Sequence, residues 1–263
     1  MSAALIVGVL NCTPDSFSDG GRYDGADAAV AAGVAMVDDG AAWIDVGGES
    51  TRPGSTPVAA EEEQRRVVSV VAALAARLNG RARISIDTYH ASTARAALAA
   101  GATVVNDVSG GLLDPEILSV AADAGAAVVL GHLRGQPATM MQAVSFHDVV
   151  AEVTTELAER VAAARAAGCR EIWADPGIGF GKRLEHNLAL LRHLPAVSRG
   201  AGVPLMVGVS RKGFLGEITG KPAERRLFGT AAAVAAAVLG GAAAVRVHDV
   251  AEMRDVVLVA DAI

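Results

Sequence analysis

The sequence has few aromatic residues and no excess of positive charge. Phe, Trp and Tyr make up only 3% of its 263 residues, whereas hydrophobic residues make up 52%. A substantial core is therefore expected, built mainly from Ala, Val and other small or branched side chains. The formal net charge of −6 argues against nucleic acid as a partner, because phosphate backbones are bound by basic faces. It leaves room for a small anionic substrate held by a few local cations.

Cysteine is also scarce, and no segment has the pattern of a membrane span. Cys12 and Cys169 lie far apart, without a Cys-X-X-Cys or Cys/His cluster, so neither a zinc site nor a disulfide framework is predicted. A reducing cytoplasm is the expected location. The first residues lack the basic region of a signal peptide. The apolar run 231–245 contains a Gly-Gly break, which predicts a buried helix, a turn and a strand rather than a membrane span.

A repeating unit organises the whole chain. A short β-branched run is followed by polar or Gly-rich residues and then by an Ala-rich amphipathic stretch. Strands are predicted at 5–11, 43–48, 83–88, 104–109, 127–132, 171–177, 204–210 and 244–249. Helices are predicted at 25–39, 61–78, 90–100, 114–124, 147–167, 185–198, 223–239 and 251–261. Eight alternating units without a linker predict an α/β protein, a single (β/α)8 TIM barrel over residues 1–263. A doubly wound open sheet is the alternative, but it would more often show a glycine fingerprint after the first strand.

Polar residues interrupt the apolar strands mainly at their carboxyl ends. They are Asn11, Asp45, Asp87, Asn106, Asp107, His132, Asp175, Ser210, Arg246 and His248. Any one of them could simply satisfy a turn. Together they are better explained by a shared ligand, because polar groups left unsatisfied in a core are destabilising. In a closed barrel these strand ends surround the active site.

The residue types indicate which ligand the cavity would take. The edge of a polar heterocycle could form hydrogen bonds with Asp87, Asn106 and Asp175. The cations come late, as Arg211 with Lys212 and as Arg246 with His248, and two of these on adjacent strands suggest a phosphate or pyrophosphate pocket. Arg211 also fits a solvated rim. The amide of Asn11 could serve Mg²⁺, which keeps most of its waters in proteins.

Two long loops follow the first two predicted strands, at residues 13–23 and 48–58. Long loops inside a compact domain are often functional lids. Their length alone does not distinguish a lid from a simple surface loop.

Seven segments at the strand ends resemble, in order, the conserved blocks of the dihydropteroate synthase family. They are GVLNCTPDSFSDGG (8–21), DVGGESTRPG (45–54), ISIDT (84–88), VNDVSGG (105–111), DPGIGFGK (175–182), VGVSRKGFLG (207–216) and VRVHDV (245–250). The resemblance covers residues 5–261. It implies a Mg²⁺-dependent transferase that joins p-aminobenzoate to 6-hydroxymethyl-7,8-dihydropterin pyrophosphate, giving 7,8-dihydropteroate and pyrophosphate in folate biosynthesis.

The resemblance also implies roles for individual residues. Those implied to bind the pterin and its pyrophosphate are Thr51, Asp87, Asn106, Asp175, Phe180, Gly208, Lys212, Arg246 and His248, and the catalytic ones among them are Asp87, Asp175, Lys212, Arg246 and His248. The implied p-aminobenzoate pocket consists of Phe17, Asp19, Thr51, Arg52, Pro53 and Ser210. Asn11 is the implied Mg²⁺ ligand. The family is usually dimeric, so a homodimer is expected, with 223–239 as a candidate interface, and a sulfonamide should compete with p-aminobenzoate.

One segment departs from the family pattern. The family commonly has Met-His-Met after the fifth strand, where this chain has Gly131, His132 and Leu133. Two alternatives remain: a pterin-binding methyltransferase barrel, and a non-catalytic paralogue that only binds pterin. The first has no need of the phosphate-binding cations and the second would have degraded loops, whereas this chain has both the cations and the loop motifs.

Overall fold

Eight parallel strands form the centre of the molecule. The computed structural model describes residues 4–13, 22–51, 54–142 and 144–263. The strands are β1 (Leu5–Asn11), β2 (Trp43–Gly47), β3 (Arg83–Asp87), β4 (Val104–Asp107), β5 (Ala127–Gly131), β6 (Ile172–Asp175), β7 (Met206–Gly208) and β8 (Ala244–Val247). Every strand lies within a range predicted from its β-branched run, and the predicted ranges extend past the strands only into the loops that follow or precede them.

The sheet closes into the predicted (β/α)8 barrel. Its order is β6-β5-β4-β3-β2-β1-β8-β7, and β6 meets β7 through a parallel bridge between Ala174 and Leu205. The Ala174 N–H donates to the Pro204 carbonyl at 3.0 Å across the same seam. This closure excludes the open doubly wound sheet.

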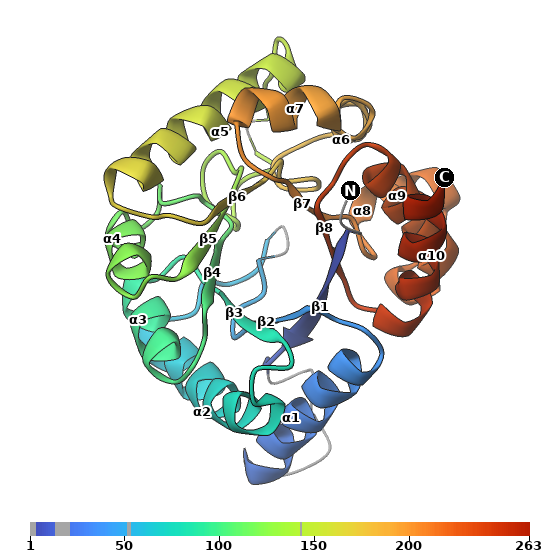
Figure 1. Ribbon diagram of the computed structural model, residues 1–263. Coiled ribbons are helices and arrows are strands. Elements are labelled where there is room, and N and C mark those ends of the chain that lie inside the picture. Colours follow the sequence, from blue (N-terminus) through green and yellow to red (C-terminus); the bar gives the residue numbers. More distant parts are fainter. Residues whose placement is uncertain (1–3, 14–21, 52–53, 143) are drawn as a thin grey trace.

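Helices surround the barrel (Figure 1). They are α1 (Arg22–Asp38), α2 (Ala60–Leu78), α3 (Ala91–Ala99), α4 (Glu116–Asp123), α5 (Val149–Ala166), α6 (Leu184–Arg192), α7 (Leu194–Ala201), α8 (Gly213–Thr219), the 3₁₀ turn η2 (Ala223–Arg225), α9 (Leu227–Leu239) and α10 (Val250–Ala262). None of the helices in the described ranges is both long and apolar enough to cross a bilayer.

Three helical segments differ from the sequence prediction. The range predicted as one helix at 185–198 is divided into α6 and α7 at His193, because Pro195 in the first turn of α7 has no N–H to continue the α6 hydrogen bonds. The range 223–239 begins with η2 and becomes α-helical only from Leu227. The short helix α8 lies outside the eight predicted helical ranges; it begins directly behind Lys212, after a turn in which Arg211 has a φ of +58°.

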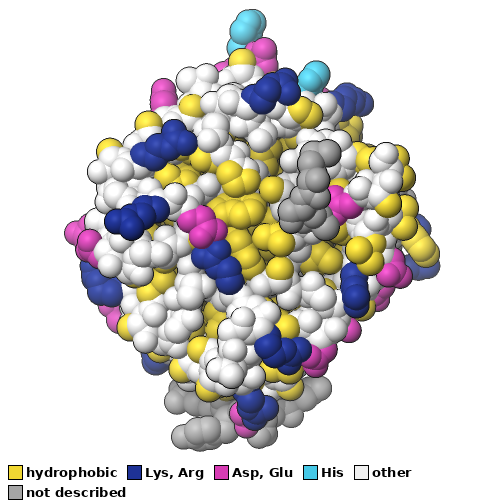
Figure 2. Space-filling model, in the orientation of Figure 1, with side chains coloured by type: hydrophobic (Ala, Val, Ile, Leu, Met, Phe, Trp, Pro, Cys, Tyr) yellow, Lys and Arg dark blue, Asp and Glu magenta, His cyan; other side chains and the backbone are white. Residues whose placement is uncertain are grey.

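The two ends of the barrel have opposite character. A cluster that includes Val7, Trp43, Val104, Val129 and Met206 fills the barrel towards the ends where the strands begin. In the view of Figure 2, hydrophobic side chains gather at the centre of the barrel. The amino-terminal end is thus packed shut, and a ligand site is left to the carboxyl ends of the strands.

Candidate active site

Eight of the residues predicted from sequence line one pocket at the carboxyl ends of the strands. They are Thr51, Asp87, Asn106, Asp175, Phe180, Gly208, Lys212 and Arg246. Strand register explains why they meet: Asp87 is paired with Asn106, and Gly208 with Arg246. Residues far apart in the chain therefore face one cavity, as the barrel prediction requires.

Arg246 lies at the base of this pocket between two carboxylates. Its Nε donates to Asp45 Oδ2 at 2.5 Å, and its Nη2 donates to Asp87 Oδ2 at 2.7 Å. Burial by itself would lower the pKa of Arg246, but the carboxylates of Asp45 and Asp87 outweigh burial and raise it. The guanidinium is therefore charged at any pH at which the protein folds, and its plane is fixed from two sides.

Asp45 is the part of this network that sequence reasoning left without a role. It is fully buried, and its Oδ2 also accepts a hydrogen bond from Asn106 Nδ2 at 2.9 Å. It therefore positions both a cation and an amide that face the pocket. The only available signal was its place at a strand end, because its partner Arg246 lies 201 residues away in the chain.

Asp87 differs from Arg246, because its surroundings disfavour its charged form. Burial in the pocket raises its pKa, and the nearby positive charge of Arg246 opposes that rise. The carboxylate retains a partly exposed position, with 15% of its side chain accessible. It can therefore interact with a ligand while its other face is held by Arg246.

Lys212 and Asp175 form the other side of the pocket. The Lys212 ammonium donates to the carbonyl of Ile178 and lies 4.5 Å from the centre of the Phe180 ring. Burial lowers the pKa of Lys212 to about 8, and Asp175 opposes the shift. Asp175 accepts the Gly177 N–H at 2.8 Å; burial raises its pKa, and Lys212 opposes that rise.

Gly208 keeps the space between these groups open. A Cβ at this position would lie 3.6 Å from Lys212 Nζ and 3.9 Å from Asp175 Oδ2. Any larger side chain would project into the space between the cation and the carboxylate. The pocket is therefore shaped for a flat ligand that offers hydrogen-bonding groups along its edge.

His248 and Ser210 lie together just beyond β8 and β7. The Ser210 hydroxyl is 3.0 Å from His248 Nδ1, and it accepts the backbone N–H of His248 at 3.2 Å. Neither residue is among the described residues that line the pocket. Arg211 forms an ion pair with Asp249 and has 40% of its side chain exposed, in agreement with its prediction as part of a solvated rim.

The departure at Gly131 lies in the wall formed by β5, against the backbone of Val108. A Cβ at Gly131 would lie 2.6 Å from the carbonyl oxygen of Val108 and 2.7 Å from its Cα. The backbone that follows β4 thus occupies the place that a side chain at residue 131 would take. The wall is closed by backbone instead of by a side chain.

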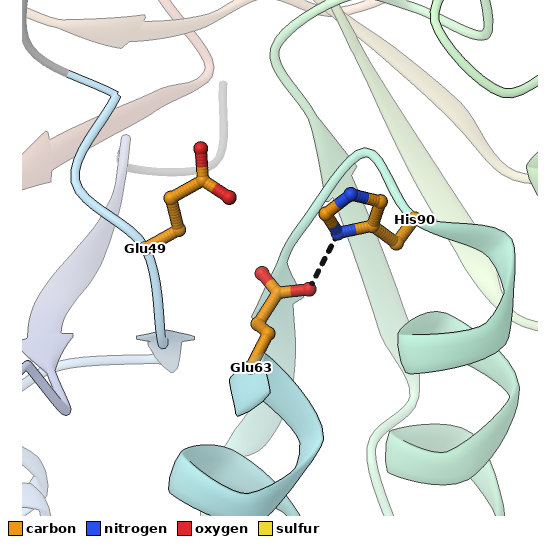
Figure 3. Close-up of side chains that lie close together, drawn as sticks. All are labelled: Glu49, Glu63 and His90. Carbon is orange, nitrogen blue, oxygen red and sulfur yellow. Dashed lines mark hydrogen bonds and ion pairs between the residues drawn. The ribbon is translucent and has the colours of Figure 1, made fainter. Parts of the chain in front are cut away.

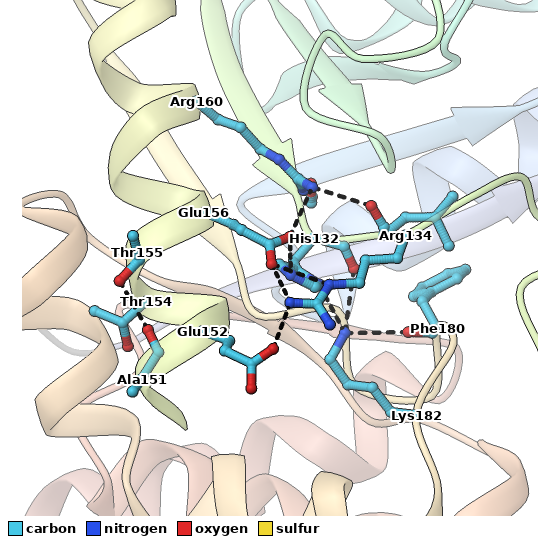
Figure 4. Close-up of polar contacts among 12 residues, drawn as sticks. His132, Arg134, Ala151, Glu152, Thr154, Thr155, Glu156, Arg160, Phe180 and Lys182 are labelled. Carbon is cyan, nitrogen blue, oxygen red and sulfur yellow. Dashed lines mark hydrogen bonds and ion pairs between the residues drawn. The ribbon is translucent and has the colours of Figure 1, made fainter. Parts of the chain in front are cut away.

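Beside that wall, His132 and Lys182 form a buried polar pair that the sequence did not predict (Figure 4). Lys182 Nζ lies 2.9 Å from His132 Nδ1, and Glu156 Oε2 lies 3.0 Å from His132 Nε2. Burial lowers the pKa of His132, and the positive charge of Lys182 lowers it further, so the imidazole is neutral. Burial also lowers the pKa of Lys182 to about 7.

The remaining predicted residues are not brought into this pocket by the described chain. Asn11 ends β1 opposite Gly47 and is half-buried, but it is not among the described lining residues. Phe17, Asp19, Arg52 and Pro53 lie outside the described residues. Their predicted roles at the p-aminobenzoate pocket stay predictions.

Comparison with known proteins agrees with this geometry. The family described as pterin binding enzymes matches residues 7–248. The dihydropteroate synthase of Mycobacterium leprae is 47% identical over 100% of this chain and 94% of its own length. That of Synechocystis is 46% identical over 98% of this chain and 89% of its own length. The structure of the Xanthomonas albilineans dihydropteroate synthase with 4-aminobenzoic acid superposes with a TM-score of 0.91 at 44% identity, covering 99% of this chain and 93% of that one. The chain therefore belongs to the dihydropteroate synthase family of pterin-binding enzymes.

Proposed function

We propose that this protein is a transferase that joins p-aminobenzoate to 6-hydroxymethyl-7,8-dihydropterin pyrophosphate, giving 7,8-dihydropteroate and pyrophosphate. The observation that carries the proposal is the convergence of Asp87, Asn106, Asp175, Lys212 and Arg246 on one pocket. These groups offer acceptors, an amide and cations around a space suited to a flat heterocycle. The family membership gives that heterocycle its identity.

In the proposed complex the side chains of the pocket form hydrogen bonds with the edge of the pterin ring. Asp87 and Asp175 accept hydrogen bonds from ring N–H groups, and Asn106, held by Asp45, offers an amide. Lys212 donates to the ring from the side of Phe180. In the described structure the Lys212 ammonium donates a hydrogen bond to the Ile178 carbonyl. A bound pterin would replace that carbonyl as the acceptor.

The chemistry needs charge stabilisation more than a nucleophilic side chain. Departure of pyrophosphate places cationic character on the pterin methylene group, conjugated into the ring. The negative charges of Asp87 and Asp175 stabilise that character, while Arg246 and His248 balance the charge of the leaving group. The amine of p-aminobenzoate attacks as the neutral species and loses its proton afterwards, so no strong base is required.

The proposed cofactor is Mg²⁺, with Asn11 as its protein ligand. Asn11 lies at the carboxyl end of β1, next to Gly47 of β2, and its amide oxygen is a hard, neutral donor. A site with one such ligand fits an ion that retains its waters and also binds the substrate's phosphates. The ion would neutralise the charge of the departing pyrophosphate.

We also propose a homodimer in the cytoplasm. Large hydrophobic side chains are exposed on the neighbouring helices α9 and α10, including Phe228, Leu239, Leu258 and Val259, and these two helices pack side by side. Exposed large apolar side chains on two adjacent helices are a feature of protein–protein interfaces. The free, buried thiols of Cys12 and Cys169 suit a reducing compartment.

The test is synthesis of 7,8-dihydropteroate by the purified protein with both substrates and Mg²⁺, followed by mass spectrometry and by release of pyrophosphate. Lys212→Ala should reduce turnover at least 100-fold, whereas Lys221→Ala, at an exposed lysine nine residues further along, should not. Folded protein that binds the pterin but forms no product would support the non-catalytic paralogue and overturn the enzyme proposal.

A further inference from the structure

A second cluster of ionisable side chains lies next to the pocket, between the segments that follow β2 and β3. Glu49 lies two residues after β2, Glu63 is in the first turn of α2, and His90 directly precedes α3. Figure 3 shows the three side chains directed towards one another. Nothing in the proposed reaction uses them.

The donor atoms of the three side chains lie close together. His90 Nδ1 and Glu63 Oε2 are 3.0 Å apart, and one donor atom from each of the three residues lies within 4.8 Å of the others. Ligands bonded at about 2.1 Å to one tetrahedral Zn²⁺ would be separated by about 3.4 Å, so small side-chain shifts would bring the three donor atoms onto one ion. The two carboxylates are buried: Glu49 is 7% exposed and Glu63 is 1% exposed.

One oxygen of this cluster has no partner in the described chain. Glu49 Oε1 accepts the Tyr89 hydroxyl at 2.9 Å, but the buried Oε2 of the same carboxylate has no hydrogen bond. A buried carboxylate oxygen without a donor is destabilising. A cation bound between Glu49 and Glu63 would satisfy it.

The charge of the surroundings favours a cation as well. The adjoining cavity, of about 320 Å³, is lined by Glu49, His90 and Asp114 and contains no Lys or Arg among its described lining residues. It has room for the water molecules that would complete a coordination shell.

We propose that Glu49, Glu63 and His90 bind a divalent transition-metal cation of the Zn²⁺ class. One imidazole nitrogen with two carboxylate oxygens is a donor set that Zn²⁺ and its neighbours accept, whereas Mg²⁺ prefers oxygen ligands alone. The ion replaces the contact between His90 and Glu63. It joins three segments: the β2–α2 loop that carries Thr51, the start of α2, and the segment after Asp87. Thr51 and Asp87 themselves line the pocket.

The site is tested by titrating Zn²⁺ into chelator-treated full-length protein by isothermal titration calorimetry, without substrates. One equivalent should bind, and at least tenfold more tightly than Mg²⁺. Glu49→Gln and His90→Gln should each weaken the binding at least tenfold. Asn11→Ala should leave it unchanged, which separates this site from the proposed Mg²⁺ site and makes the result independent of the proposed activity.

Two matched controls address adventitious binding. Glu61→Gln changes an exposed carboxylate in the same first turn of α2, and His147→Ala removes an exposed histidine; neither should alter the affinity. X-ray absorption of the Zn²⁺-loaded wild-type protein should show one imidazole and otherwise oxygen ligands, a readout that does not depend on any variant folding. Absence of stoichiometric binding, equal affinity in Glu49→Gln and His90→Gln, or sulfur or several imidazoles around the ion would overturn the proposal.

Discussion

Replacing Asp45 by alanine should weaken the base of the pocket more than any change at a surface carboxylate. Asp45 is fully buried and holds both Arg246 and Asn106 through one oxygen. Removing one partner from a fully buried ion pair costs about 3–5 kcal/mol. Arg246 keeps Asp87 at 2.7 Å, and 20% of its side chain is exposed, so we expect the lower end of that range, about 3 kcal/mol in the free energy of unfolding.

An isosteric change separates charge from hydrogen bonding. Asp45→Asn can place its amide oxygen where Oδ2 now lies and so accept from both partners. The charge is lost and the amide nitrogen takes the place of the buried Oδ1, which has no partner, so the loss should be about 1–2 kcal/mol, still below that of alanine. Both variants should also reduce kcat/KM of the proposed reaction, with alanine the more severe, because Arg246 and Asn106 lose their fixed orientation.

Urea unfolding followed by circular dichroism measures these differences. A melting temperature would fall by roughly 2–4 °C for each kcal/mol in a chain of this size. The control is Asp38→Ala, which removes an exposed ion pair with Arg81 at 2.5 Å and should change stability by less than about 1 kcal/mol. If Asp45→Ala were no more destabilising than Asp38→Ala, Asp45 would not anchor the pocket.

Three further results are expected. Gly131→Ala should destabilise the protein by about 1–3 kcal/mol in urea unfolding, because its Cβ would meet the Val108 backbone at 2.6 Å; unchanged stability would show that this wall can shift. Since the pKa of Lys182 falls to about 7 in the folded state, the unfolded chain binds more protons than the folded chain between about pH 7 and 10, and stability should rise with pH across that window. Lys182→Met should flatten this rise, and an equal slope in both proteins would place the lysine in solvent. Phe228→Asp should convert the proposed dimer to a monomer in sedimentation velocity, and an unaltered dimer would locate the interface elsewhere.

The sequence contained enough to predict the barrel and most of the pocket. Each strand is a short β-branched run bounded by Gly or polar residues, so its position follows from local pattern. Parallel strands in a closed barrel end at the same face, and this rule alone brings Asp87, Asn106, Asp175 and Arg246 together. Lys212 follows β7 closely enough to be placed by the same reasoning.

What the sequence could not supply were partners set by packing. Asp45 was visible as a polar strand end. Its pairing with Arg246 depends on β2 and β8, which are not neighbours in the sheet but lie on either side of β1. Lys182 and His132 are 50 residues apart, and their contact depends on how the β6–α6 loop folds over β5.

Glu63 was hidden in a different way. It belongs to a run of three glutamates at the start of α2, which by pattern is an exposed, dipole-favoured helix start. Only the fold shows that the third of them turns inward to Thr88 and His90.

A crystal structure with 6-hydroxymethylpterin bound tests most directly whether the strand ends form a pterin site. The ring should lie in the pocket with its edge within hydrogen-bond distance of Asp87, Asn106 and Asp175, and with Lys212 turned from the Ile178 carbonyl to the ring. A pterin bound elsewhere, such as in the cavity beside Glu49 and His90, or a pocket left empty at saturating ligand, would contradict it.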